Sequence, residues 1–159
     1  MKRQAQTTTS QSLSQPGPSA NRPVRVFVET HLKAVNVTSH QHSEQVQFLV
    51  PRTGIPRIAS DHAFWILPPN AGIVIPRAFE HSMVTTSATD LVIANIHPGL
   101  IDPAENQCRV VSINKLLTAL LETIAAFPIE RPPDAGEWRI MEVFFDQIRI
   151  APTQKYSVA

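Results

Sequence analysis

The sequence predicts a mainly β domain, either a sandwich or a barrel, followed by two amphipathic α-helices. Between Val24 and His97, short runs rich in Val, Ile and Phe recur about every ten residues, separated by Pro, Gly and Asn. After Arg109 the apolar residues recur at the spacing of a helix instead. A chain of 159 residues with 43% hydrophobic and 17% charged residues suits one domain with a single core.

The amino-terminal segment, residues 1–22, is predicted to be a disordered tail. It consists mostly of Gln, Ser, Thr and Pro, so it cannot bury enough apolar surface to offset the entropy of ordering. Its basic start lacks the apolar core of a secretory signal, and no later window approaches the ~18 apolar residues of a membrane span. The lone Cys108 excludes an intrachain disulfide and suits a reducing compartment. We therefore expect a cytoplasmic protein without membrane contact.

The β body is predicted over residues 23–112. Its strand-like runs cover residues 24–29, 46–50, 55–60, 63–67, 72–76, 82–86 and 91–97. The doublet Pro68-Pro69, followed by Asn70 and Gly72, marks a turn that no central strand would tolerate. Basic residues are scattered and the formal charge is only +1, so the sequence predicts no direct contact with nucleic acid.

A helical segment is predicted over residues 113–150, with a flexible carboxyl terminus at 151–159. In the first helix the apolar positions 113, 116, 117, 120, 121, 124 and 127 fall on one face, Ser112 is placed to cap the start, and Pro128 ends it. The second helix begins at Asp134, because Glu137 three residues later completes a capping-box pattern. Its apolar residues at helical spacing are Trp138, Met141, Phe145 and Ile148.

The stretch HQHSEQVQFLVPRTG, residues 40–54, contains the strongest candidate site. If it lies on a strand, His40 and His42 point to the same face, and two imidazoles that face one cavity can bind a cation. Gln47 and Gly54 follow at fixed distances. Further along, Pro76, Ala78 and His81 form a second group.

These two groups resemble the two motifs of the cupin superfamily, G-x5-H-x-H-x3/4-E-x6-G and G-x5-P-x-G-x2-H-x3-N. The resemblance implies a cupin-like, jelly-roll β-barrel whose mouth holds His40, His42, His81 and Gln47. The sequence departs from the motifs in that Gln47 replaces a glutamate, Asn70 and Ala78 replace glycines, and Thr85 replaces an asparagine.

A closer resemblance covers roughly residues 25–150. The runs HQHSEQVQFLV, WILPPNAGIVIP and CRVVSINKLLTALLETI occur in the order typical of the amino-terminal, cupin-like domain of AraC-type transcription regulators. The resemblance implies an effector-sensing and dimerisation domain that ends before the DNA-binding half. It also implies a dimer contact, homodimeric or with a full-length relative, on the helix face formed by Leu117, Leu121 and Ile124.

The chemistry of the histidines leaves two interpretations open. Three neutral imidazoles suit a divalent transition metal such as Ni, Zn, Fe or Cu, with Gln47 as a weaker oxygen donor. Alternatively, the cluster hydrogen-bonds a small organic effector, with Gln47 and Trp65 as ligand-binding residues, or satisfies itself. For Trp65 core packing is the competing role. His31, His62 and His97 do not lie at a metal-ligand spacing from another candidate ligand, and each is more simply a surface or core histidine.

Two further function classes compete with the regulator domain. One is a small metal-dependent cupin enzyme, a dioxygenase or isomerase; the other is a stand-alone binding protein for a metal or small molecule. Gln47 stands where the cupin motif has a glutamate, and the absence of that carboxylate argues against an oxygen-activating iron enzyme. Glu44 and Glu80 adjoin the histidines but would point to the opposite strand face. We therefore expect a protein that is not an enzyme.

Overall fold

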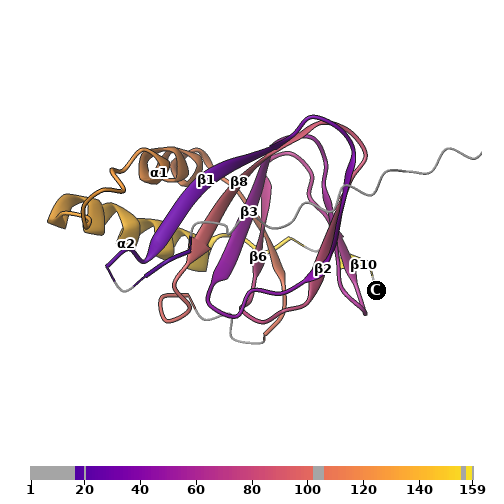
Figure 1. Ribbon diagram of the computed structural model, residues 1–159, viewed down its shortest axis with the longest axis horizontal. Helices are drawn as coiled ribbons and strands as arrows, with labels where there is room; N and C mark the ends of the chain where they lie inside the picture. The colour runs from indigo at the N-terminus through magenta and orange to yellow at the C-terminus, as the bar shows by residue number, and fades with distance from the viewer. Residues whose placement is uncertain (1–16, 20, 102–105, 155–156, 159) are drawn as a thin grey trace, which may run out of the picture.

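The computed structural model describes residues 17–19, 21–101, 106–154 and 157–158. Within them the chain forms two five-stranded sheets that face each other and two helices that cover the outer face of one sheet (Figure 1). The strands are β1 (Val24–His31), β2 (Val35–His40), β3 (Val46–Thr53), β4 (Arg57–Ala59), β5 (Phe64–Ile66), β6 (Ala71–Ile75), β7 (His81–Thr85), β8 (Thr89–Ile96), β9 (Arg109–Ser112) and β10 (Ser157–Val158). The helices are α1 (Lys115–Ala125) and α2 (Ala135–Ile150).

The order of the strands is that of a double-sheet jelly roll. One sheet, here sheet 1, has the order β1-β8-β3-β6-β9, and the other, sheet 2, has the order β10-β5-β4-β7-β2. From β1 to β8, consecutive strands thus cross from one sheet to the other, except for the β4–β5 hairpin within sheet 2, as in a jelly roll built from Greek keys. The predicted fold class is confirmed. Each of the seven strand-like runs corresponds to a strand, because its β-branched and aromatic residues fit a pleated, largely buried surface.

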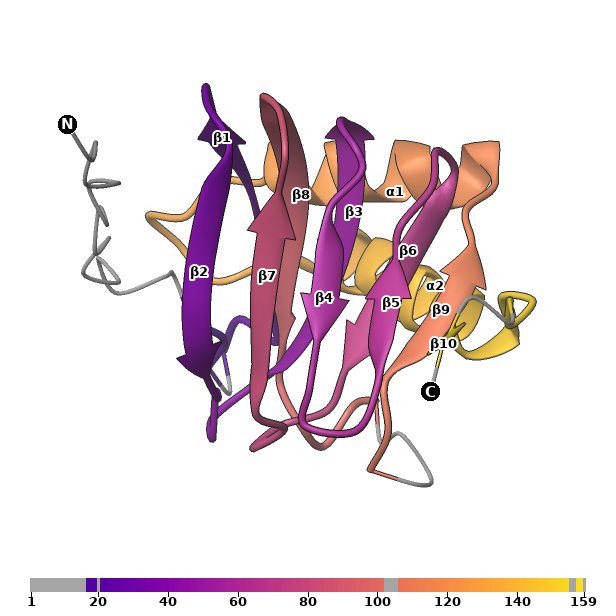
Figure 2. The same ribbon diagram turned by 90° about the vertical axis from the view of Figure 1, so that its right-hand side faces the viewer.

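Sheet 1 separates two hydrophobic clusters, where the sequence predicted one core. The cluster between the sheets includes Leu49, Ile73 and Ile93, and the cluster between sheet 1 and the helices includes Phe48, Phe144 and other residues. Helices cover the outer face of sheet 1, while the outer face of sheet 2 is uncovered (Figure 2). For this reason β3 is buried on both faces over its first six residues and lacks the alternation of a half-exposed strand.

The helix starts differ in how well the sequence predicted them. At α2 the prediction is confirmed: Asp134 accepts from the Glu137 backbone N–H, and the Glu137 carboxylate accepts from the Asp134 N–H. At α1 the cap is Asn114, whose side-chain oxygen accepts from the Leu117 N–H at 2.8 Å. The prediction of Ser112 was wrong because Ser112 is still the last residue of β9.

The predicted dimerisation residues lie inside the chain's own core. Leu117, Leu121 and Ile124 are only 1%, 3% and 5% exposed, and they belong to the cluster between sheet 1 and the helices. The exposed apolar side chain of α1 is its neighbour Leu116, which is 48% exposed. The apolar face that suggested a subunit contact therefore packs on the barrel and α2, and these three side chains are not available to a second subunit.

The two ends of the described chain are tied to the body by hydrogen bonds. Arg22 donates to the carbonyls of Pro128 and Arg131 at 2.7 and 2.5 Å; residues 1–16 of the predicted tail lie outside the described residues. Beyond α2, Ser112 N–H donates to Pro152, Gln154 N–H donates to Val110, and β10 pairs with β5. The part of 151–159 that the structure describes thus contacts both sheets. Among the described helices, none has the length and hydropathy needed to cross a membrane.

Candidate metal and effector site

The three predicted histidines converge at one end of the space between the sheets. His40 ends β2 and is the register partner of His81, which begins β7. His42 lies in the turn beyond β2, so the prediction that both residues of the pair occupy a strand was wrong. Their rings nevertheless come together: the centroids are 4.4 Å apart for His40 and His81, 4.9 Å for His40 and His42, and 5.8 Å for His42 and His81.

The turn before β7 holds His42 in place. Ala78, at the position of a motif glycine, has a φ of +56°, and its N–H donates to the carbonyl of His42 at 2.7 Å. A left-handed conformation is unfavourable for alanine. This hydrogen bond joins the two motif segments directly, and it brings His42 to the site although the strand has ended.

Backbone carbonyls fix the tautomers of two of the rings. His40 Nδ1 lies 2.8 Å from the Thr38 carbonyl and His81 Nδ1 lies 2.8 Å from the Phe79 carbonyl. Because a carbonyl oxygen only accepts, each Nδ1 carries a proton, and in the neutral ring this leaves the lone pair on Nε2. His42 Nε2 is buried and has no hydrogen-bond partner among the described residues. One nitrogen from each of the three rings lies within 4.8 Å of the others.

Burial favours the neutral form of His42 and His81. It lowers the pKa of His81 to about 4; the hydrogen bond to Phe79 opposes this shift, and repulsion from His40 and His42 adds to it. Burial also lowers the pKa of His42, with a smaller contribution from His40. The lone pairs of His42 and His81 are therefore not occupied by protons near neutral pH, which is the state that binds a metal.

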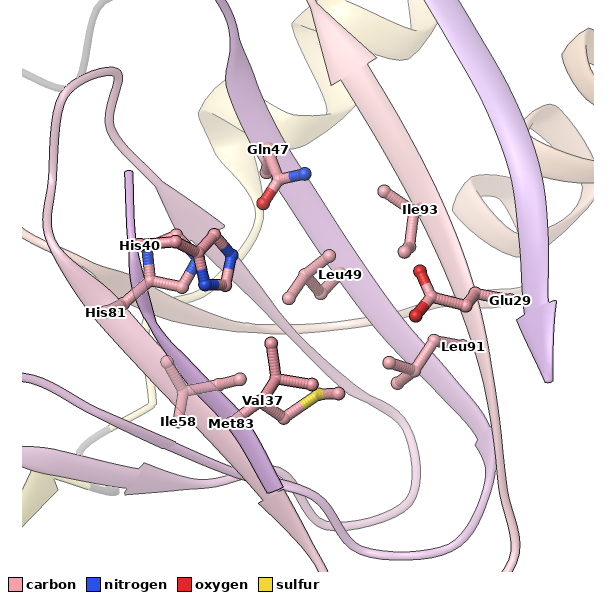
Figure 3. A pocket seen from close by; sticks show the side chains of 10 residues that line it. All are labelled: Glu29, Val37, His40, Gln47, Leu49, Ile58, His81, Met83, Leu91 and Ile93. Carbon is pink, nitrogen blue, oxygen red and sulfur yellow. The ribbon is translucent and has the colours of Figure 1, made fainter. Parts of the chain in front are cut away.

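A small pocket adjoins the histidines. It is lined by His40, His81, Gln47 and Glu29 together with the apolar side chains of Val37, Leu49, Ile58, Met83, Leu91 and Ile93 (Figure 3). The cavity volume is about 40 Å³. Since one water needs at least ~10–15 Å³ of cavity volume, the cavity has room for an ion and a few waters.

The two predicted ligand-binding residues lie in different surroundings. Gln47 lines the pocket and is only 3% exposed, and its Nε2 donates to Asn95 Oδ1 at 3.0 Å. Trp65 is 8% exposed and packs in the cluster between the sheets, with its ring centroid 6.2 Å from that of Phe79. Trp65 is not among the residues that line the pocket.

Sequence reasoning missed two polar residues of this region, Glu29 and Asn95. Glu29 on β1 lines the pocket, and its Oε1 lies 2.8 Å from His31 Nε2. The signal was present, because strand alternation in VRVFVETH places Phe27, Glu29 and His31 on one face. Asn95 is fully buried beside Gln47, and only the pairing of β3 with β8 reveals that proximity.

Other reactive groups lie outside the pocket. Glu80 accepts from Ser39 and Glu44 from Ser43, both at exposed positions; both glutamates lie in connecting segments and not on strands, so the strand alternation from which we predicted their orientation does not apply. Burial raises the pKa of the Cys108 thiol to about 12, which leaves it protonated and unreactive.

No protein-family model matches the chain. Among curated proteins it is similar to the HTH-type transcriptional regulator NimR of Escherichia coli K12, with 26% identity over 116 residues, which are 73% of this chain and 42% of NimR. The chain thus spans less than half the length of that relative.

Among solved structures the chain is similar to ToxT of Vibrio cholerae, with a TM-score of 0.59 and 11% identity over 79% of this chain and 54% of ToxT. It is also similar to the AraC-like transcriptional activator CuxR, with a TM-score of 0.58 and 12% identity over 82% of this chain and 54% of CuxR. The fold of this chain therefore occurs in about half of each of these regulators. Together with the NimR similarity, these findings confirm the predicted resemblance to AraC-type regulators.

Proposed function

We propose that this chain is the effector-sensing domain of an AraC-type transcriptional regulator, and that its effector site holds a divalent transition metal on His40, His42 and His81. The fold shared with ToxT and CuxR and the sequence similarity to NimR support the regulator. The same relationships favour a role without catalysis. A regulator acts on DNA, so we place the domain in the cytoplasm.

One observation carries the metal proposal: three imidazole nitrogens converge within 4.8 Å, and backbone carbonyls accept from Nδ1 of two of the rings, which leaves Nε2 as the lone-pair nitrogen of the neutral ring. This arrangement of outer hydrogen bonds is the one that metal-ligating histidines use. If the three histidines served only to hydrogen-bond one another, every buried ring nitrogen would have a hydrogen-bond partner. His42 Nε2 is buried and has no such partner in the described part of the chain. Such imidazole sites suit Ni, Zn, Cu or Fe(II).

The size of the pocket supports a metal over a long organic effector. One solved ToxT structure is described as bound to an unsaturated fatty acid. Pockets for organic ligands of drug size measure about 300–1,000 Å³. The pocket beside the histidines of this chain measures about 40 Å³, so it fits an ion with its waters or a very small ligand.

The sensing step follows from the positions of the ligands. A metal on these residues would link the end of β2, the turn beyond it and the start of β7, which are held together now mainly by backbone pairing. An ion that binds one arrangement of the barrel mouth more tightly shifts the domain toward that arrangement. In the longer regulator the second half would respond to that shift. Dimerisation, with another copy or with a full-length relative, belongs to this proposal and must use residues other than Leu117, Leu121 and Ile124.

The test is elemental analysis of the tag-free protein after exposure to Ni²⁺ or Zn²⁺ and removal of unbound metal. We expect about one ion per chain. Replacing His40 and His42 by Ala should abolish this uptake and leave the circular dichroism spectrum unchanged. His62→Ala, at an exposed histidine away from the pocket, is the matched control and should bind as the wild type does. Unchanged uptake by the double variant would remove the proposed site.

A further inference from the structure

The side chain of Gln47 is held in one orientation by a buried hydrogen bond. Gln47 on β3 and Asn95 on β8 are register partners in neighbouring antiparallel strands. They are 3% and 0% exposed, so water does not compete for the 3.0 Å bond from Gln47 Nε2 to Asn95 Oδ1. The two amides thus form a fixed pair, of which Gln47 lines the pocket together with His40 and His81.

The direction of this hydrogen bond decides which atom of Gln47 faces the histidines. A primary amide can bind a metal through its oxygen, while its NH₂ group is a hydrogen-bond donor without a lone pair to give. Because the nitrogen of Gln47 is engaged by Asn95, the oxygen lies on the other side. Figure 3 shows that oxygen on the side of His40 and His81.

We propose that Asn95 is a positioning residue for the metal site: it turns the Gln47 amide so that Oε1 becomes the fourth donor beside His40, His42 and His81. This inference rests on the proposed function. It also defines the chemistry of the site, because three neutral imidazoles and an amide oxygen carry no charge. Such a set favours Ni, Cu and Zn over Mn and Mg, which prefer carboxylates.

A double-mutant cycle tests the role of Asn95. Co²⁺ affinity and the visible absorption of the Co²⁺ complex are measured for the wild type, Asn95→Ala, Gln47→Ala and the double variant. If Asn95 acts through Gln47, Asn95→Ala lowers Co²⁺ affinity by about tenfold and changes the spectrum, since outer hydrogen bonds to metal ligands have effects of this size. In the Gln47→Ala background the same change has no further effect.

A second substitution covers the case in which Asn95→Ala does not fold, as judged by circular dichroism and thermal unfolding. Asn95→Asp keeps the shape of the side chain, and a carboxyl oxygen can accept from Gln47 Nε2 whether the group is ionised or neutral, so it holds Gln47 in the same orientation. We expect Asn95→Asp to bind Co²⁺ at least as tightly as the wild type and to give the same spectrum. Weaker binding by folded Asn95→Asp would overturn the proposal.

The remaining outcomes separate this inference from the proposed function. An equal loss of affinity from Asn95→Ala in both backgrounds would mean that Asn95 acts on the structure as a whole, and would overturn its positioning role alone. Unchanged binding by folded Asn95→Ala would do the same. A wild-type protein that takes up no Co²⁺ would overturn the metal site itself and the role of Asn95 with it.

Discussion

His81 combines deep burial with a titratable ring, which makes the metal-free protein sensitive to acid. The side chain is 3% exposed and its pKa is about 4, against an ordinary value near 6.5. Between these two values the unfolded chain binds a proton that the folded chain does not. The contribution of a neutral His81 is therefore fully present above about pH 6.5 and is lost as the pH falls towards 4.

We expect the free energy of unfolding of the metal-free protein to fall by about 3 kcal/mol from this residue between pH 7 and pH 4, at 1.36 kcal/mol per pKa unit. Urea unfolding at several pH values measures it. His81→Gln cannot titrate, so it should lose this part of the pH dependence while the carboxylates contribute equally to both proteins. Parallel pH profiles for the two proteins would contradict the expectation.

The residue at position 47 should determine which metals the site prefers. Gln47→Glu supplies a charged carboxylate beside the three histidines, and hard cations such as Mn²⁺ prefer carboxylate oxygens. We expect the ratio of Mn²⁺ to Ni²⁺ affinity to rise on the order of tenfold. Calorimetric titrations with both ions measure the ratio, and Gln47→Ala is the control for loss of the amide. An unchanged ratio would mean that position 47 does not touch the ion.

At the residue scale the sequence could predict that the three histidines lie together near Gln47, because their spacing along the chain is itself the signal. The structure brings all three rings together and places Gln47 in the adjoining pocket. Asn95 could not be found in this way, since it lies 48 residues from Gln47 in sequence and their contact depends on the register of β3 and β8. The metal and the ligand-binding role of Trp65 stay predictions.

The apolar face of α1 is an element-scale feature with a clear energetic consequence. Leu121 is 3% exposed and Leu116, five residues earlier on the same helix, is 48% exposed. Leu121→Ala should lower the free energy of unfolding by about 2–5 kcal/mol, because it leaves a cavity in the core. Leu116→Ala should change it by less than about 0.5 kcal/mol. Urea unfolding of both variants tests this, and equal effects would mean that α1 does not pack as described.

The elements themselves could be predicted where the pattern was local. Strand-like runs and the capping box of α2 gave the correct positions because each is encoded by neighbouring residues. The start of α1 was misplaced since Ser112 and Asn114 are both good caps, and the pairing of β9 with β6 decides between them. The short strand β10 has no local signal, and it exists through its pairing with β5.

The joining of α2 to the barrel belongs to the scale of the whole molecule. Arg109 on β9 donates to the carbonyls of Ile148 and Ala151 at 2.8 and 3.2 Å, at the end of the helix where free carbonyls gather. Arg109→Met removes both bonds and keeps most of the apolar stem. We expect a loss of about 1–3 kcal/mol of unfolding free energy.

Hydrogen exchange should locate this effect. The amides of the last turn of α2 should exchange faster in Arg109→Met than in the wild type. Arg139→Met, at an exposed position on the same helix, is the control and should leave them unchanged. Equal exchange at the end of α2 in all three proteins would show that Arg109 does not hold the helix.

The two-sided burial of β3 has a consequence for how a regulator of this design communicates. Leu49 faces the pocket, while its neighbour Phe48 faces α2, where its ring centroid is 6.3 Å from that of Phe144. Adjacent residues of a strand point in opposite directions but share one backbone, so neither can be displaced without the other. In the sensing role proposed for this domain, a displacement at the pocket would therefore have to cross only the thickness of a single polypeptide chain before it reached a helix.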